Sequence, residues 1–310
     1  MNRYPHVSVH ALDTGAITMP LRFFVTPLDD KNEMTVLPSM SFLIQHRNPA
    51  SKKVTRILFD LGIRVDTTQY TESMRDYLLP QNKAMNPANI HSALHQGGLS
   101  EFDIDYAIFS HLHWDHIGVP GELSRAQFVL GGGGLQYLST AGVNGTYERM
   151  LFPPLRTVEL HQPGSDPSAT ARISPLFAEP WRPVATLPHT LDIFGDGSCF
   201  VVDSPGHMPG HLNMLCRLEG GNYVYLAGDI CHDRRILTGE MDMSTWPDPM
   251  YPAIMRCAHT NKAAAISTIK RVIDIEDGNT MLGKVEVVLS HDGGWLDDAK
   301  QAGRLWPGKL

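Results

Sequence analysis

The chain has 310 residues, of which 42% are hydrophobic and 19% are charged, as in a soluble globular protein that buries about three quarters of its unfolded surface and needs no disulfide bonds. Its 26 Lys and Arg residues against 33 Asp and Glu residues give a net charge of −7, which argues against a nucleic-acid partner. The amino terminus lacks the apolar stretch of a signal peptide and no window is apolar for long enough to span a bilayer, so we expect one cytoplasmic domain over residues 1–310, without a membrane partner.

Three apolar segments in the first third of the chain predict strands. Residues 41–45 and 56–60 flank a polar turn at residues 48–52 and predict an antiparallel pair. The second of these strands ends in Asp60-Leu61-Gly62. Residues 104–110 are apolar, β-branched and aromatic, and they predict a buried strand.

The run His111-Leu112-His113-Trp114-Asp115-His116 directly follows that third strand. Neutral imidazole and carboxylate are the usual ligands of zinc and similar divalent ions. If the chain stays extended after the strand, His111 and His113 point to the same side and can hold one ion. Asp115 and His116 come at the following turn, where they can serve a neighbouring ion. The alternative of surface histidines beside a helix-capping Asp115 is weaker, because the motif has the expected context of strand and then turn.

The middle of the chain predicts a further strand, a helix start and a long connector. Residues 127–130 predict the strand, and the four glycines at 131–134 predict a turn that opens a helix, since the Lys-Ser/Thr of a P-loop is missing. Residues 141–198 are rich in proline and aromatics and long for a loop in a compact domain, so we expect a pocket-forming insertion there. Candidate pocket residues are Phe152, Phe177 and Trp181 on one side and Tyr251 on the other, with core packing as the alternative.

Three later strands each deliver one candidate ligand at their carboxyl ends, where open α/β sheets place their ligands. They are residues 200–203 before His207, residues 223–227 before Asp229, and residues 285–290 before His291. Each residue alone could be a helix cap or a satisfied core residue, but their recurrence together with the first motif favours one shared site. Residues 263–275 show the apolar spacing of an amphipathic helix.

The order of these motifs resembles the metallo-β-lactamase-fold hydrolases. His-x-His-x-Asp-His at 111–116 is followed by Pro-Gly-His at 205–207, Gly-Asp at 228–229 and Ser-His at 290–291. Within that superfamily, the run 110–116, the turn 204–211 and the lack of a cysteine ligand are most similar to the N-acyl homoserine lactone lactonases. The resemblance covers residues 40–292 and implies an α/β fold, an αββα sandwich of two mixed sheets flanked by helices.

The resemblance also implies roles for single residues. It assigns His111, His113 and His207 to one metal, Asp115, His116 and His291 to a second, and Asp229 to both. We expect two divalent metal ions, zinc first, with manganese, iron or cobalt as alternatives. Such a pair makes a bridging hydroxide available at neutral pH, and Asp115 could pass a proton to the leaving group. Asp60 is expected to orient a ligating histidine.

One position departs from the lactonase pattern. Those enzymes carry a tyrosine three residues after the bridging aspartate, whereas this chain has His232. His232 could donate a hydrogen bond to the substrate carbonyl in its place, could mark a different substrate, or could be only a structural residue. We therefore predict a dinuclear hydrolase that opens a lactone or related cyclic ester of a small-molecule substrate. A lactam or other cyclic amide, a thioester or a phosphodiester remain alternative substrates, a non-catalytic metal-binding protein is a further alternative, and a homodimer is left open.

Overall fold

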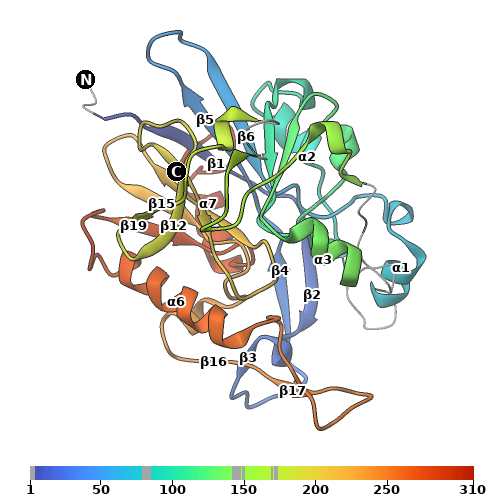
Figure 1. Ribbon diagram of the computed structural model, residues 1–310. Helices are drawn as coiled ribbons and strands as arrows, with labels where there is room; N and C mark the ends of the chain where they lie inside the picture. Colours follow the sequence, from blue (N-terminus) through green and yellow to red (C-terminus); the bar gives the residue numbers. More distant parts are fainter. Residues whose placement is uncertain (1–3, 79–84, 142–147, 149–150, 169, 171–173) are drawn as a thin grey trace.

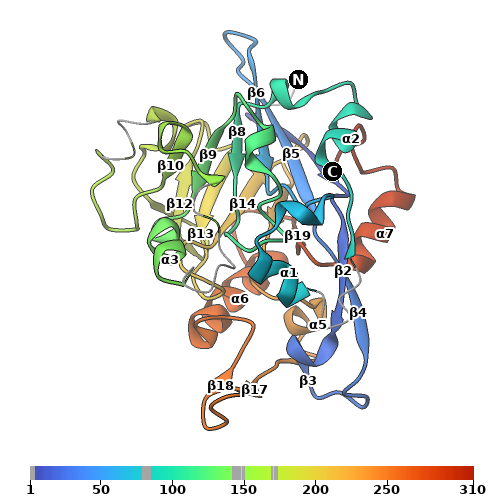
Figure 2. The same cartoon turned by 90° about the vertical axis from the view of Figure 1, so that its right-hand side faces the viewer.

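The computed structural model describes residues 4–78, 85–141, 148, 151–168, 170 and 174–310. Two six-stranded sheets dominate it (Figures 1 and 2). The first sheet runs in the order β1 (Val7–Leu12), β5 (Ser41–Arg47), β6 (Val54–Phe59), β8 (Tyr106–Ile108), β9 (Gln127–Leu130) and β10 (Thr157–Glu159). β1, β5 and β6 pair antiparallel, and β6, β8, β9 and β10 pair parallel. The predicted hairpin is confirmed, with Leu43 opposite Leu58.

The second sheet is also mixed. Its order is β11 (Arg182–Val184), β12 (Leu187–Asp192), β13 (Cys199–Asp203), β14 (Leu212–Arg217), β15 (Tyr223–Leu226) and β19 (Val285–Val288). All neighbours pair antiparallel except β15 and β19, which are parallel. β15 and β19 therefore end at the same edge, and the candidate ligands that follow them leave the sheet side by side.

The main core lies between the two sheets, because alternate residues of each strand point into it. On β13, Cys199 and Val201 face this core, while Phe200 and Val202 face the opposite side. On β5, Ile44 faces the main core and Leu43 the outer side of the first sheet. The α/β fold of two mixed sheets flanked by helices is thus confirmed.

The described α-helices lie around the two large sheets and the small sheets. They are α1 (Glu72–Leu78), α2 (Ile90–His95), α3 (Gly134–Ala141), α5 (Arg234–Leu237), α6 (Lys262–Glu276) and α7 (Gly293–Gln301). Residues of α2 and α3 pack on the first sheet and those of α6 on the second. α3 begins at the predicted glycine turn, and α6 confirms the predicted amphipathic helix. Among the described residues, no helix is long and apolar enough to cross a membrane.

Small sheets extend from one end of the sandwich, at the bottom of Figure 1. β2 (Ala16–Pro20) pairs with β4 (Met34–Pro38) and β7 (Met85–Asn86), β3 (Val25–Thr26) with β16 (Asp242–Met243), and β17 (Trp246–Pro247) with β18 (Met255–Arg256). β2, β4 and α1 share a separate apolar cluster, which includes Ile17, Phe24, Leu37 and Met74. This cluster is separate from the main core and from the clusters on the outer sides of the two large sheets.

The expected insertion at 141–198 is not one long loop. It contains β10, the last strand of the first sheet, and β11 and β12, which begin the second. Residues 142–147, 149–150, 169 and 171–173 of it lie outside the described residues. The connector therefore links the two sheets as well as separating the motifs.

Candidate metal centre

The loop after β8 carries the first candidate ligands and is fixed by backbone and side-chain hydrogen bonds. The backbone N–H of Leu61 donates to His116 O over 2.7 Å, and that of Leu212 donates to Ser110 O over 2.7 Å. These bonds tie the loop to the end of β6 and to β14 of the other sheet. The described His-x-His-x-Asp-His run therefore starts at the junction of the two sheets.

Asp60 is the anchor of this loop. Its Oδ1 accepts the Ser110 backbone N–H at 2.7 Å, and its Oδ2 accepts the Ser110 hydroxyl at 2.7 Å and His116 Nδ1 at 2.9 Å. Ser110 Oγ in turn lies 2.9 Å from His111 Nδ1. One buried carboxylate thus orients His116 directly and His111 through the serine, and both rings keep Nε2 for another partner.

Three imidazoles from two separate segments converge on one point. His111 Nε2 and His113 Nδ1 are 2.9 Å apart, and His207 Nε2 lies 3.2 Å from the first and 3.0 Å from the second. Burial lowers the pKa of His111 and His207 well below the usual value and lowers the pKa of His113 to about 4. All three rings are neutral near pH 7, which is the form that coordinates a metal ion.

A second group lies beside the first, and Asp229 belongs to both. Asp229 Oδ2 is 3.6 Å from His111 Nε2 and 3.4 Å from His207 Nε2. Its Oδ1 is 3.3 Å from His116 Nε2 and 3.2 Å from His291 Nε2, which also lies 3.3 Å from Oδ2. Asp115 Oδ2 completes the second group, 3.8 Å from His291 Nε2. The two oxygens of one carboxylate therefore face the two sets of donors.

Electrostatics keep this shared carboxylate ionised. Burial alone would raise the pKa of Asp229, but the surrounding histidines, His291 first among them, hold it well below the usual range. Burial disfavours a charged His116, yet Asp229 and the other nearby carboxylates outweigh burial and raise the pKa of that ring well above its usual value. Asp229 and His116 thus share a proton that a bound cation would displace.

The candidate ligands from the second sheet are held by tight turns. Gly206 has φ +143°, and a Cβ there would lie 2.4 Å from Ala265 Cα, so the turn before His207 rests directly on α6. His211 Nδ1 donates to Ser204 O at 2.9 Å, and its Nε2 accepts the Asp229 backbone N–H at 3.0 Å. His291 Nδ1 donates to Pro38 O at 2.6 Å. No sequence pattern assigned a role to His211, although it lies in the same turn as His207.

His232 also points into the cluster. Its Nε2 lies 3.1 Å from Asp229 Oδ2. Its ring stacks on Phe24 at 4.7 Å and on His291 at 5.4 Å between centroids. Neighbouring His259 is buried as well, with its ring centroid 5.5 Å from that of His232, and the sequence analysis did not single it out. The side chain of His232 is therefore held in one orientation at the edge of the site.

The donor chemistry fits two divalent cations. His111, His113, His207 and Asp229 form one set whose ligand atoms lie within 4.8 Å of one another, and Asp115, His116 and His291 form a neighbouring set. Among the buried atoms of the cluster that make no hydrogen bond to any described residue are His116 Nε2 and Asp229 Oδ1, which lie among the donors of the two sets. Unpaired buried polar atoms are costly, and coordination to a cation would satisfy both.

The cluster forms the floor of a cavity of about 760 Å³. Besides cluster residues, the described lining includes Ile17, Met19, Phe23, Phe24, Leu37, Met74, Tyr77, Trp114, Tyr137, Trp246, Pro249, Arg256, Cys257, Ala258 and Thr260. These residues come from β2, β4, α1, α3, the β17–β18 hairpin and the loops between them. The walls are therefore built by the small sheets and by helices of the amino-terminal half.

The expected pocket residues lie elsewhere, and this prediction is corrected. Phe152 packs on Phe109 at 5.3 Å between centroids in the core beneath the first sheet, and Phe177 is fully buried in the main core. Trp181 packs at the edge of that core, and its Nε1 donates to His161 O at 2.7 Å. Tyr251 is 60% exposed on the β17–β18 hairpin and is not part of the described lining.

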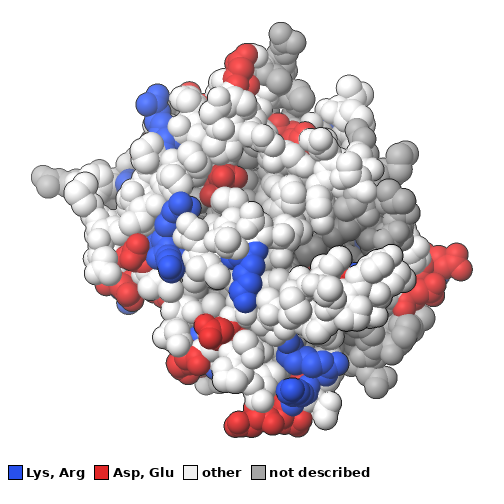
Figure 3. All heavy atoms as spheres, turned by 60° about the horizontal axis from the view of Figure 1, so that its bottom comes forward, with Lys and Arg blue, Asp and Glu red and all other residues white. Residues whose placement is uncertain are grey.

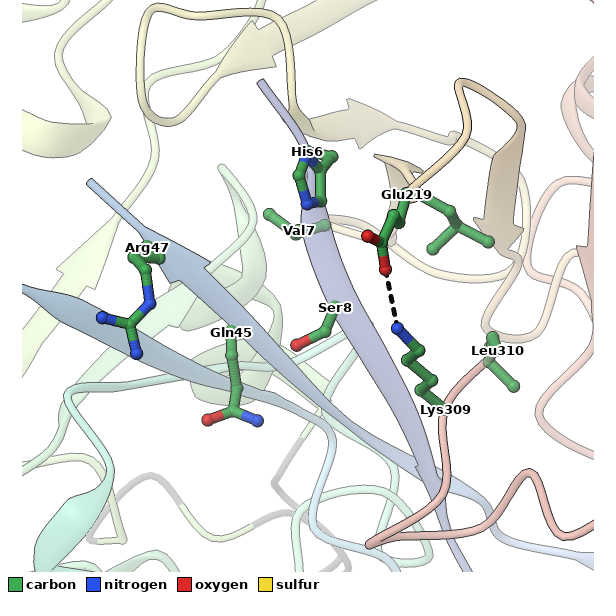
Figure 4. Close-up of a pocket in the computed structure, with 9 residues that line it drawn as sticks. His6, Val7, Ser8, Gln45, Arg47, Glu219, Lys309 and Leu310 are labelled. Carbon is green, nitrogen blue, oxygen red and sulfur yellow. Dashed lines mark hydrogen bonds and ion pairs between the residues drawn. The ribbon is translucent and has the colours of Figure 1, made fainter. Parts of the chain in front are cut away.

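A second cleft contains none of the candidate ligands. It measures about 220 Å³ and is lined by residues of β1, β5 and the carboxyl terminus, among them His6, Gln45 and Arg47. Figure 4 shows Lys309 beside Glu219, whose Oε2 lies 2.7 Å from the Lys309 Nζ. The Lys309 and Glu219 charges of this cleft neutralise each other, and the cleft contains no candidate ligand. We therefore assign the chemistry to the larger cavity.

Comparison with known proteins places the chain among metallohydrolases. The family model of the metallo-beta-lactamase superfamily matches residues 34–237. Among curated proteins, the chain is 28% identical over 252 residues to the cytochrome P450 monooxygenase mpaDE of Penicillium roqueforti, covering 74% of this chain and 26% of that protein. The chain therefore spans about a quarter of that relative.

A further curated relative is named a gamma-lactamase, and one similar solved structure is that of a lactone hydrolase. The gamma-lactamase FDB1 of Fusarium pseudograminearum is 25% identical over 272 residues, covering 81% of this chain and 60% of that protein. The solved structure of an N-acyl homoserine lactone hydrolase, with the product N-hexanoyl-L-homoserine bound at its catalytic metal centre, matches with a TM-score of 0.66. It shares 15% identity and covers 99% of this chain and 100% of that chain, which supports the fold.

Proposed function

The chain belongs to the metallo-beta-lactamase superfamily, and from that premise we propose that it is a dinuclear metal-dependent hydrolase that opens a lactone or related cyclic ester. The observation that carries the proposal is the shared carboxylate. Asp229 turns one oxygen to His111 and His207 and the other to His116 and His291, at the floor of the cavity.

Two ions, held by His111, His113 and His207 and by Asp115, His116 and His291 with Asp229 between them, would supply the Lewis acidity that activates a water and polarises a carbonyl. The water oxygen then bonds to the carbonyl carbon and the ring C–O bond breaks, giving a hydroxy acid. The proton released by the water goes to the departing alkoxide. Asp115 can carry it, because its carboxylate lines the cavity beside His291.

His232 is proposed to bind the substrate carbonyl oxygen. Its ring is fixed between Phe24 and His291, and it lines the cavity beside Asp229. His232 Nε2 lies 3.1 Å from Asp229 Oδ2, and its N–H can be shared with a carbonyl oxygen that approaches the cluster, which is the role expected for a preorganised donor. We expect His232→Ala to lower kcat about 100-fold, as for removal of one such donor, with unchanged metal content. His232→Tyr should restore part of the loss. Equal turnover of His232→Ala and wild type would leave the residue a structural role only.

The test of the function is a metal analysis joined to a substrate panel. Purified protein should contain two equivalents of a divalent metal, zinc first, by mass spectrometry of the metal. It should open acyl homoserine lactones or other lactones, lose that activity with a chelator, and regain it with added zinc, manganese or cobalt. A protein that binds less than one equivalent, or that hydrolyses phosphodiesters and no lactone, would contradict the proposal.

A cyclic amide is the second candidate substrate, because one of the relatives is named a gamma-lactamase. The same metal ligands can serve the hydrolysis of an ester or of an amide. The amide differs in that its leaving amine must be protonated. Matched lactones and lactams of equal ring size separate the two. A higher kcat/KM for the lactam, after division by the rate of hydroxide hydrolysis of each compound, would favour the amide.

A further inference from the structure

The walls of the cavity are aromatic on several sides. In the described lining, six Phe, Tyr and Trp rings come from the segment after β2, from α1, from the loop after β8, from α3 and from β17. They are Phe23, Phe24, Tyr77, Trp114, Tyr137 and Trp246. Aromatic rings that pack against a flat ligand in offset or edge-to-face arrangements contribute more binding free energy than an aliphatic contact of equal area does.

Contacts between neighbouring side chains hold several of these rings in place before any ligand binds. Phe23 and Trp246 lie 5.0 Å apart between centroids, tilted by 59°. Trp114 meets Tyr70 edge-on at 5.7 Å, and the hydroxyl of Tyr70 donates to Trp114 O. A wall that is already ordered loses little conformational freedom when a ligand binds.

The described part of the walls offers no Lys or Arg without an acidic partner. Arg256 is the one Lys or Arg in the described lining, and both its Nε and its Nη2 contact Asp248 Oδ2. Asp248 also accepts the backbone N–H groups of Met250 and Tyr251 at 2.7 and 2.9 Å. Figure 3, which views this end of the molecule, shows acidic and basic side chains scattered rather than gathered into a patch. An anionic substituent away from the reacting carbonyl would lose its water without gaining a partner.

We propose that the cavity takes an uncharged lactone fused to an aromatic ring, in preference to a lactone with a long linear chain or an anionic substituent. This inference rests on the lactone-opening function proposed above. The reaction remains the addition of one water across the acyl C–O bond to give a hydroxy acid. The aromatic walls select the part of the substrate that does not react.

The test compares two nine-carbon δ-lactones, 3-isochromanone and δ-nonalactone. Each kcat/KM is divided by the rate constant for hydroxide opening of the same lactone, so that intrinsic reactivity cancels. Binding of the matching cyclic ethers, isochroman and 2-butyltetrahydropyran, is measured by calorimetry on the metal-loaded protein. A carboxylated 3-isochromanone is compared with its methyl ester to test for charge.

Two variants report on the wall. Trp246→Leu keeps an apolar side chain but removes a ring, and we expect it to weaken isochroman binding and lower kcat/KM for 3-isochromanone about 3- to 10-fold. The aliphatic compounds should change less than about twofold. Tyr251→Leu removes a ring from the same hairpin outside the lining, and it should change neither preference.

The outcomes separate the two proposals. Equal normalised rates and equal ether binding, or a Trp246→Leu variant with unchanged preference, would overturn the aromatic selectivity while lactone opening stands. Ether binding that favours isochroman and depends on Trp246, without turnover of any lactone, would support the cavity inference and refute the lactonase function. A carboxylated substrate that reacts as fast as its methyl ester would overturn the requirement for neutrality.

Discussion

Replacing Asp60 by asparagine should weaken metal binding without removing any candidate ligand. The carboxylate accepts the Ser110 backbone N–H, the Ser110 hydroxyl and His116 Nδ1 at 2.7 to 2.9 Å. An amide in its place offers one oxygen, and its NH₂ group faces a donor. Asparagine is the suitable replacement because Asp60 has φ +63°, a left-handed conformation that Asn tolerates better than most residues do.

The size of the effect follows from these contacts. Loss of an outer-shell partner of a ligating histidine typically costs 10- to 100-fold in metal affinity, about 1.4 to 2.8 kcal/mol. One buried donor without an acceptor costs about 1 to 3 kcal/mol of folding free energy. We therefore expect Asp60→Asn to raise the zinc Kd by that factor, measured by competition with a chromophoric chelator. Urea unfolding of the metal-free protein should show the second cost separately.

A matched carboxylate elsewhere supplies the control. Asp196 accepts His46 Nε2 at 2.9 Å and the Ser198 backbone N–H at 3.0 Å, and it lies outside the described cluster. Asp196→Asn should lower stability and leave the zinc Kd unchanged. A zinc Kd for Asp60→Asn within twofold of wild type, or an equal rise in both variants, would refute the positioning role of Asp60.

Three further predictions concern the turn before His207, a buried acid and the ions. Gly206→Ala should lower the free energy of unfolding by about 2 to 3 kcal/mol and weaken zinc binding, because its Cβ would overlap Ala265. Gly220→Ala, also at positive φ but with open space around it, should lower the free energy of unfolding by less, as measured with urea. Burial raises the pKa of the Asp203 carboxyl to about 6, so the native state loses stability as pH rises from the unfolded pKa of about 4 through 6. Relative to Asp203→Asn, wild type should lose about 2 kcal/mol of unfolding free energy between pH 4 and pH 7, measured by urea titration. The same pH dependence of the unfolding free energy in both proteins would contradict this. Chelation should lower the midpoint of thermal unfolding by several degrees in a way that added zinc reverses, and a midpoint insensitive to chelator would contradict metal binding to the native state.

The candidate ligands could be found from the sequence because each follows an apolar strand. β13, β15 and β19 end within four residues of His207, Asp229 and His291, and strand ends at one edge bring their following residues together. An orienting role for Asp60 was also expected, from its place at the end of a strand and from the family resemblance. The structure adds that this strand, β6, pairs with β8. What these patterns left open was the partner of each ring nitrogen, which depends on tertiary contacts.

The cavity walls could not be predicted in the same way. Phe23 lies in a three-residue 3-10 helix and Trp246 in a two-residue strand, and no periodic pattern in the sequence separates such short elements from a loop. Phe152 and Phe177 stand in a proline-rich connector that reads as a loop, yet pairing of β10 with β9 and of β12 with β13 draws that connector into the sheets. Packing between distant segments overrides local composition there.

The candidate ligands are divided between the two sheets, since four follow β8 and the other three follow β13, β15 and β19. A bound ion would therefore fasten chain positions as far apart as His111 and His291, 291 − 111 = 180 residues. Closing a loop of that order by a covalent cross-link removes about 5 kcal/mol of unfolded-state entropy. In the loaded protein the halves of the sandwich should come apart together in a single transition, whereas the metal-free halves are joined mainly by the packing of their facing side chains.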